Sequence, residues 1–296
     1  MLDLSLSEYF ERNMQHETFH GQFVITELNN SDRTKDKADI FPMRLKAYSI
    51  IVVLSGEMQI GMNYLQHTIR KTTVIHFSVN DIISNILLSS DFTGYLLNFS
   101  PELRSEIMGL TSGVRLQKVI QLKRAFPILI LNDEEFLRVE GHIMRMKSYI
   151  ADTTHLYRSH IIKNEVMNLF FDLDNSRWKE HGDGEIELTH TELLREKFRE
   201  MLVEKCHQHR DVGFYARELC VTPDYLSRVI REYDGGSAMT WIANAVVTEA
   251  KYLIRQPKKT INQIASELNF PDQSTFGKFF RKQTGMSPLM YKKGRL

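Results

Sequence analysis

The sequence has no apolar run long enough to cross a membrane. Its longest apolar stretch, Ile50 to Leu54, is far shorter than the about 20 residues that a spanning helix needs. Residues 1–13 carry acidic side chains among scattered leucines and lack a basic start, which argues against a signal peptide. We therefore expect a cytoplasmic protein that makes no use of a membrane.

Cysteine is also scarce, with two residues, Cys206 and Cys220. Their spacing is not that of a paired motif, and no pattern of neighbouring histidines indicates zinc. The sequence therefore predicts two reduced thiols in the core, with neither a disulfide nor a structural metal.

The composition is that of a folded, globular chain. Of its 296 residues, 42% are apolar and 25% are charged, proportions that exclude a disordered or fibrous protein. This length allows two domains, each with its own core.

Positive charge is concentrated at one end of the chain. From Lys251 onward ten basic residues face only Glu267 and Asp272, a net charge of +8, although the whole chain carries +1. The preceding 250 residues are therefore at −7. A basic segment on an acidic body is typical of a polyanion partner, but a solvated surface without a partner can look the same.

Short strands are expected between about Gln22 and Ser100. The β-branched and aromatic run 47–54 is followed by the turn 55–57 and a shorter apolar run at 58–60, which predicts a hairpin. Further strands are expected at 73–77, 81–87 and 94–99. Such regularly spaced strands indicate a barrel or sandwich.

After Pro101 the apolar period changes to that of helices. One predicted helix carries a stripe with coiled-coil spacing, and a second, from about His155 to Leu173, could pair with it as an antiparallel hairpin. The stripe consists of Phe136, Val139, Ile143, Met146 and Ile150. Two interpretations stay open: the stripe packs on its neighbours within the chain, or it forms the seam of a homodimer. Residues 179–190, which include Gly182 and Gly184, are the expected linker between domains 1–178 and 191–296.

The C-terminal part contains two predicted helix-turn-helix units. In the first, a short helix at 214–219 is followed by Thr222 as an N-cap, Pro223 in the first turn and Asp224 near the positive end of the helix dipole. Arg228 on this second helix could bond guanine in the major groove. In the second unit, Asp272 caps a helix that ends at Thr284-Gly285.

A continuous helical pattern from Met239 to Ile254 joins the two units. A helix of about 16 residues spans roughly 24 Å. That length could hold both recognition helices near the roughly 34 Å spacing of successive major grooves.

Residues 191–293 resemble the DNA-binding domain of the AraC/XylS family of bacterial transcription regulators. The resemblance rests on the following positions: Ala216, Tyr225-Leu226-Ser227-Arg228, Gly235, Trp241-Ile242, Glu249-Ala250-Lys251, Ile264-Ala265, Phe270, Phe276, Phe279-Phe280-Arg281-Lys282, Gly285, Ser287-Pro288 and Tyr291. The chain departs from the family pattern at Asn269 (usually glycine), Val246 (usually arginine) and Ala238 (commonly proline).

The resemblance implies which residues meet DNA. Base contacts are expected from Asp224, Ser227, Arg228, Gln273, Ser274, Gly277 and Lys278, and backbone contacts from Thr222, Arg231, Arg281 and Lys282. Gly277 has no side chain and therefore offers no side-chain readout at that position. The resemblance also implies an N-terminal cupin-like β-barrel with a helical hairpin, hence an α+β fold, homodimerisation and contact with RNA polymerase.

The favoured function is a DNA-binding transcription regulator that responds to a small-molecule effector, without enzymatic activity or a cofactor. One alternative is a regulator whose barrel binds no small molecule, and another is a cupin-type enzyme tethered to DNA. The second alternative finds little support in the residues. The barrel segment offers only the scattered His67 and His76 with Glu57, a poor set for a metal.

Overall fold

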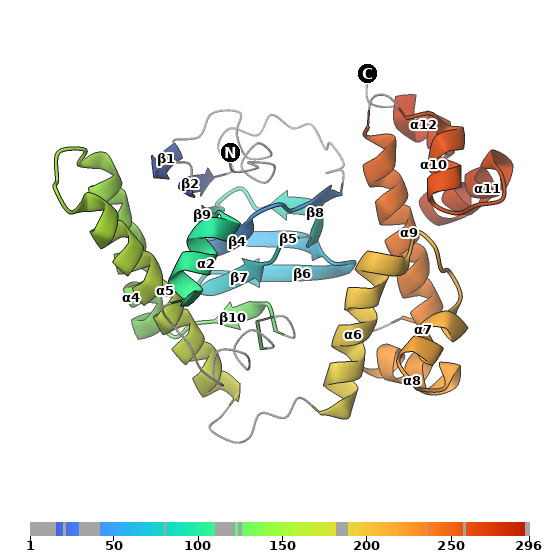
Figure 1. Cartoon of the computed structure of the whole chain (residues 1–296), viewed down its shortest axis with the longest axis horizontal. Coiled ribbons are helices and arrows are strands. Elements are labelled where there is room, and N and C mark those ends of the chain that lie inside the picture. The colour runs from blue at the N-terminus through green and yellow to red at the C-terminus, as the bar shows by residue number, and fades with distance from the viewer. Residues whose placement is uncertain are drawn as a thin grey trace.

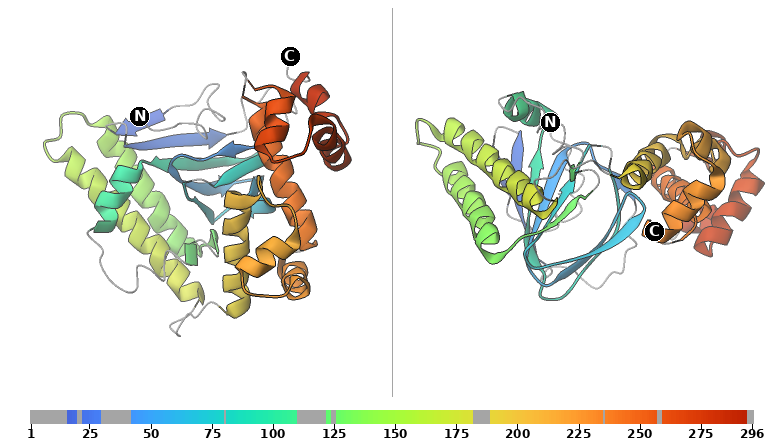
Figure 2. Two further views of the ribbon diagram at one scale, coloured as in Figure 1. Left: turned by 45° about the vertical axis from the view of Figure 1, so that its right-hand side comes forward. Right: turned by 90° about the horizontal axis from the view of Figure 1, so that it is seen from below.

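The computed structural model describes residues 16–19, 22–29, 42–79, 81–109, 122–123, 126–181, 189–234, 236–256 and 259–293. Two β-sheets form the centre of the molecule, with a pair of long helices on one side and the C-terminal helices on the other (Figure 1). The two further views in Figure 2 show the same order of layers. Gly182 and Gly184 of the expected linker, and Gly235 of the family pattern, lie outside the described residues.

All strand pairs in both sheets are antiparallel. The six-stranded sheet has the order β1 (His16–Phe19), β2 (Phe23–Asn29), β9 (Thr93–Phe99), β4 (Tyr48–Ser55), β7 (Thr73–Phe77) and β10 (Ile128–Ile130). The four-stranded sheet has the order β3 (Met43–Arg44), β8 (Ile82–Leu88), β5 (Glu57–Met62) and β6 (Leu65–Arg70). Among the described residues no ladder joins the two sheets, so they form separate layers rather than a closed barrel.

The expected hairpin between β4 and β5 is wrong. β4 pairs with β7 and β9, whereas β5 pairs with β6 and β8 in the other sheet. Gly56, with φ of +70°, turns the chain from one layer to the other, and a Cβ there would come within 2.6 Å of the backbone of Phe92. The run 47–54 is continuously apolar because both faces of β4 are covered. Ile51 and Val53 face the second sheet, and Ile50 and Val52 face the long helices.

Two long helices, α4 (Asp133–Ala151) and α5 (Arg158–His181), cover the outer face of the six-stranded sheet. Asn132 starts α4 with a capping box, in which its side chain accepts from the backbone N–H of Glu135 and the Glu135 carboxylate accepts from the backbone N–H of Asn132. The helical pair that the sequence predicted is confirmed. The short helix α2 (Pro101–Gly109) follows β9 where the apolar period changes.

The proposed dimer stripe is buried within the chain. Phe136, Val139, Ile143, Met146 and Ile150 all lie in the core between α4, α5 and the sheet, and Ile143 and Met146 are 0% exposed. A second copy cannot reach these side chains while the pair stays on the sheet. The dimer seam is therefore wrong, and the stripe packs on its own neighbours.

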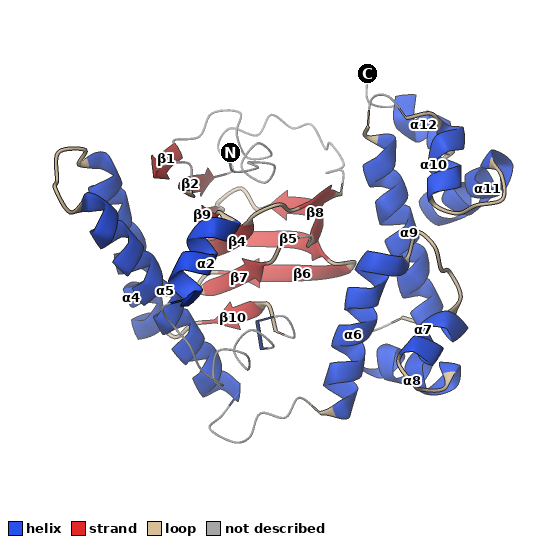
Figure 3. Cartoon of the chain, viewed as in Figure 1, coloured by secondary structure: helices blue, strands red, loops and turns tan. Residues whose placement is uncertain are grey.

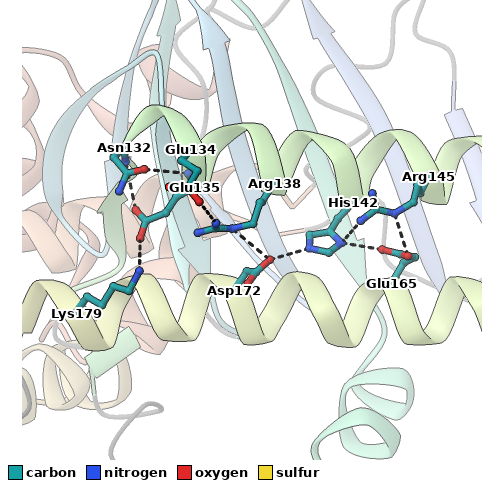
Figure 4. Close-up of polar contacts among 9 residues, drawn as sticks. All are labelled: Asn132, Glu134, Glu135, Arg138, His142, Arg145, Glu165, Asp172 and Lys179. Carbon is teal, nitrogen blue, oxygen red and sulfur yellow. Dashed lines mark hydrogen bonds and ion pairs between the residues drawn. The ribbon is translucent and has the colours of Figure 1, made fainter.

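A row of charged and polar side chains runs along the outer edge of the α4–α5 pair (Figure 4). His142 of α4 lies between two carboxylates of α5, with Nδ1 2.7 Å from Glu165 and Nε2 2.9 Å from Asp172. Arg145 donates to Glu165 at 3.0 Å, and Lys179 reaches Glu135 at 3.5 Å. Because these partners lie in reversed order along the two helices, the row fixes an antiparallel register.

The C-terminal helices share one core. They are α6 (His190–Lys205), α7 (Val212–Glu218), α8 (Pro223–Asp234), α9 (Ala238–Ile254), α10 (Ile261–Glu267), α11 (Gln273–Thr284) and α12 (Pro288–Lys293) (Figure 3). The joining helix α9 is buried along most of its length, including Trp241, Ile242, Val246 and Ala250. Val246 occupies the position that is usually arginine in the family, and here it belongs to the core.

The α+β class is thus confirmed, with antiparallel sheets preceding an all-helical part. α5 continues to His181 and α6 starts at His190, so both ends of the expected linker are helical. No helix in the described ranges is both long and apolar enough to cross a membrane.

Candidate nucleic-acid interface

The first unit consists of α7, a tight turn and α8. Ala216 on α7 is fully buried, where its small side chain lets α8 approach closely. The turn closes when the backbone N–H of Val221 donates to the carbonyl of Ala216 at 2.9 Å. Thr222 then caps α8, its Oγ1 accepting from the N–H of Tyr225 at 3.2 Å. The predicted N-cap is therefore confirmed.

Cys220 corrects another expectation, that both thiols lie in the core. It is exposed and not part of the core, and it occupies the left-handed position of the first turn with φ of +55°. Cys206 is buried as expected, and burial raises the pKa of its thiol to about 12.

The second unit repeats the plan with α10 and α11. Asn269 takes the left-handed position with φ of +55°, as its turn role predicts. The N–H of Phe270 donates to the carbonyl of Ala265 at 2.8 Å, matching the bond that closes the first turn. Asp272 caps α11 by accepting from the N–H of Thr275 at 2.7 Å, and Gly285 ends the helix at φ of +81°.

Each second helix has a buried face and an outward face. On α8 the inward side chains are Leu226, Val229 and Ile230, and on α11 they are Phe276 and Phe280. The expected DNA residues Thr222, Asp224, Arg228, Arg231, Gln273, Ser274, Lys278, Arg281 and Lys282 are exposed, while Ser227 and Gly277 are half-buried. The structure thus gathers these residues on two outward helix faces.

Two outward positions have features that matter for DNA reading. The guanidinium carbon of Arg228 lies 5.2 Å from the ring centroid of Tyr225, so the arginine rests along its own helix against a side chain one turn nearer the N-cap. Open space surrounds the position where Gly277 would carry a Cβ, since no atom lies within 4 Å. Close approach to a base edge is therefore sterically possible at Gly277.

Comparison with known proteins agrees with this geometry. Residues 215–294 match a family model described as a helix-turn-helix domain. The chain is 30% identical over 86 residues to the arabinose operon regulatory protein of Salmonella typhimurium, an alignment that covers 29% of this chain and 31% of that protein. Residues 215–294 thus form a helix-turn-helix domain similar to the one in AraC-type regulators. The chain spans less than a third of the arabinose regulator's length, so that relative bears on the C-terminal domain alone.

Other relatives align over more of the chain. The raffinose operon transcriptional regulatory protein RafR of Pediococcus pentosaceus is 23% identical over 202 residues, covering 63% of this chain and 66% of RafR. The crystal structure of unsaturated fatty acid bound ToxT from Vibrio cholerae covers 92% of this chain and 95% of its own, with 15% identity and a TM-score of 0.41.

The C-terminal helical domain contacts the sheets through the turn between β5 and β6. Asn63 and Tyr64 both have positive φ, and Tyr64 with Leu65 packs against the C-terminal core. Burial beside Cys206 raises the pKa of the Tyr64 hydroxyl well above its ordinary value. Arg44 adds an ion pair of 3.0 Å with Glu249 of α9. The sequence reasoning missed these contacts, because β6 was not expected and no local pattern identifies a partner 205 residues away.

A cavity of about 1100 Å³ lies beside this contact. His67 of β6, His76 of β7 and Ile128 of β10 line it from the strands. Arg195, Glu196, Arg199 and Glu200 of α6 and Glu249 of α9 line it from the helices. Burial, together with the charge of Arg199, lowers the pKa of His67. The cavity therefore brings charged groups of α6 and α9 against strands of both sheets.

His76 lies at the buried end of this region, among cations. Its Nδ1 is 3.0 Å from a guanidinium nitrogen of the fully buried Arg177, which can only donate, so the ring proton is on Nε2. Burial and the charges of Arg177 and Lys123 lower the pKa of His76 well below its ordinary value. Burial also lowers the pKa of Arg177 to about 10. No other described group satisfies Nε2 of His67 or of His76.

The described residues contain no cluster of three or more histidine, cysteine, aspartate or glutamate side chains placed to hold a metal. His67 and His76 both line the cavity from strands of different sheets, and Glu57 instead forms an ion pair of 2.8 Å with Arg70.

Proposed function

We propose that this protein is a sequence-specific regulator of transcription that binds double-stranded DNA through both helix-turn-helix units. The observation that carries the proposal is the pair of outward faces on α8 and α11, held on one buried helix, α9. The 17 residues of α9 span roughly 25 Å. Units on such a support can enter successive major grooves, which lie roughly 34 Å apart on one side of DNA.

The two kinds of contact are assigned as the family resemblance implies. Base edges are read by Asp224, Ser227, Arg228, Gln273, Ser274, Gly277 and Lys278, while Thr222, Arg231, Arg281 and Lys282 meet phosphates. Arg228 is the side chain best suited to bidentate recognition of guanine, because its fork of donors matches the O6 and N7 acceptors.

Selection of sites from a random DNA pool tests the proposal. The wild type should return a two-box sequence, and Arg228→Ala should weaken binding to it by about 1–3 kcal/mol and relax the preference mainly at one base pair. Arg217→Ala is the matched control, since Arg217 is an exposed arginine on α7 and should leave the preference unchanged. Failure of the wild type to select any sequence would contradict the proposed function.

We further propose that residues 1–178 form a cupin-like sensor domain and that a polar small molecule is its effector, bound in the cavity between the strands and α6 and α9. A volume of this order suits a small ligand, and the lining offers both charges and buried histidine ring nitrogens without a partner among the described groups. A ligand there would contact α9, which supports both DNA-binding units.

Thermal unfolding of the protein across a metabolite panel tests whether the cavity binds an effector. Stabilisation by one compound, abolished in Arg199→Ala, would support the site, and a uniform response would favour a regulator without a ligand.

Homodimerisation and contact with RNA polymerase, which the family resemblance implies, stay proposals. The buried α4 stripe cannot serve the first, so pairing needs another surface. Sedimentation of the full chain at micromolar concentration, with and without DNA, tests it. Elemental analysis of the purified chain tests the remaining alternative, a metal-dependent cupin-type enzyme tethered to DNA.

A further inference from the structure

The connection between α6 and α7, residues 206–211, packs against the first helix-turn-helix unit and is hydrogen-bonded to it. The His209 ring stacks on Phe214 of α7, with centroids 3.5 Å apart and planes 6° from parallel. The Tyr215 hydroxyl donates to the backbone carbonyl of His209 at 3.0 Å, and Asp211 caps α7 by accepting from the N–H of Phe214 at 2.8 Å. This connection therefore moves with the first unit.

The same connection also forms hydrogen bonds with the turn of the second unit. The two terminal nitrogens of Arg210 donate to the backbone carbonyls of Leu268 and Asn269, at 2.5 and 2.7 Å. The guanidinium carbon lies 4.1 Å from the ring centroid of Phe270. In return, Nδ2 of Asn269 donates to the backbone carbonyl of Gln208 at 3.2 Å. We call Gln208, Arg210 and Asn269 the bracket.

The chemistry of the bracket is specific to the side chains of Arg210 and Asn269, whereas Gln208 contributes its backbone carbonyl. The last carbonyls of a helix have no partner within it, and the planar fork of arginine satisfies the two that follow α10 in one plane. Asn269 stands where the family usually has glycine, and its left-handed φ would suit glycine equally well. Asparagine adds the one group that glycine lacks, an amide that reaches Gln208.

We propose that the bracket fixes the separation and rotation of α8 relative to α11, and so determines which spacing between two DNA boxes the protein accepts. Gln208, Arg210 and Asn269 are positioning residues, not DNA contacts. α9 joins the two units along one path through the chain, and the bracket joins them along a second. Two independent connections restrain relative rotation far more than one does. This inference rests on the proposed two-box mode of DNA binding.

The geometry of DNA allows the effect of the bracket on box spacing to be measured. One added base pair moves the second box by about 3.4 Å along the axis and rotates it by about 35°. A rigid pair of units cannot follow that change and still place both recognition helices on their boxes. A pair free to rotate can follow it at lower cost.

The experiment uses the full chain and the two-box sequence that the wild type selects, with the spacer lengthened or shortened by one base pair. The wild type should bind about tenfold or more weakly at each altered spacing. Arg210→Met keeps an apolar stem against Phe270 but removes both donors, and it should reduce that penalty to about threefold or less while each single box binds as before. Arg217→Met, the same change at an exposed α7 position, should keep the wild-type spacing profile.

Two further variants keep the inference open to refutation. Asn269→Gly preserves the backbone conformation and removes only the bond to Gln208, so it should fold and broaden the spacing profile partly, even if Arg210→Met proves unstable. Arg210→Lys retains the charge with a single donor group, and its spacing penalty should lie between those of the wild type and Arg210→Met.

An undiminished spacing penalty in folded Arg210→Met and Asn269→Gly would overturn the inference. An equal loss of affinity at every spacing and on single boxes would also overturn it, by making Arg210 a DNA contact or a general stabiliser. Failure of the wild type to select two boxes would instead refute the proposed function.

Discussion

Ile143 tests whether the α4 stripe belongs to the core of one chain or to an interface between copies. Its side chain is 0% exposed and contacts the core formed by α4, α5 and the six-stranded sheet. Ile143→Ala removes three carbon atoms, worth about 2.4 kcal/mol at about 0.8 kcal/mol each. The cavity left behind adds to this, so we expect a loss of about 3 kcal/mol in the free energy of unfolding, within the ~2–5 kcal/mol range for such truncations.

Leu137 provides a matched control on the same helix. It is 65% exposed, so Leu137→Ala should change stability by no more than about 0.5 kcal/mol. Trp178 on α5 and Trp241 on α9 are the two tryptophans of the chain. A Trp241→Phe background therefore leaves Trp178 fluorescence to report on the α4–α5 pair during unfolding in urea.

Sedimentation of the same proteins completes the test. If the stripe is intramolecular, Ile143→Ala should have the oligomeric state of its parent while losing stability. A loss below about 1 kcal/mol, or dissociation into stable single copies, would contradict the packing described above and return the stripe to an interface.

Three further predictions concern charge, pH and thiol chemistry. Arg281 and Lys282 are exposed in the last turn of α11, and replacing both with alanine should weaken binding to all DNA sequences. The slope of log affinity against log salt should fall by about 0.9 for each phosphate that is no longer neutralised. An unchanged slope would show that neither residue touches the DNA backbone. His76 is held neutral in the folded chain because its pKa is lowered, whereas the unfolded chain takes up a proton below about pH 6.5. The free energy of unfolding should therefore keep its full value above that pH and decrease as the pH drops toward the folded-state pKa of His76. In thermal unfolding, His76→Asn should lose stability less steeply over this range. In the native protein iodoacetamide should label the exposed Cys220 and spare Cys206, which is buried with a raised pKa; mass spectrometry showing equal labelling would refute this assignment.

The sequence determined most of the C-terminal domain, because its signals are local. Caps, turn residues and the 3.6 period each act within a few positions, so Thr222, Asp272, Asn269 and the boundaries of α9 could be located without tertiary information. The outward residues of α8 and α11 followed from the same period, since the inward face of a short amphipathic helix defines the outward one.

Only the tertiary structure decided which surfaces meet. The spacing of the α4 stripe established that one face of that helix is buried, but periodicity does not distinguish a helix of the same chain from a helix of another copy. The run 47–54 indicated a strand, but not that both its faces are covered, nor the passage at Gly56 from one sheet to the other. Arg210, Tyr64 and the His76–Arg177 pair join segments that lie 58, 142 and 101 positions apart. Contacts at such separations depend on how the layers pack, and that is settled by the burial of the whole core rather than by any short stretch of sequence.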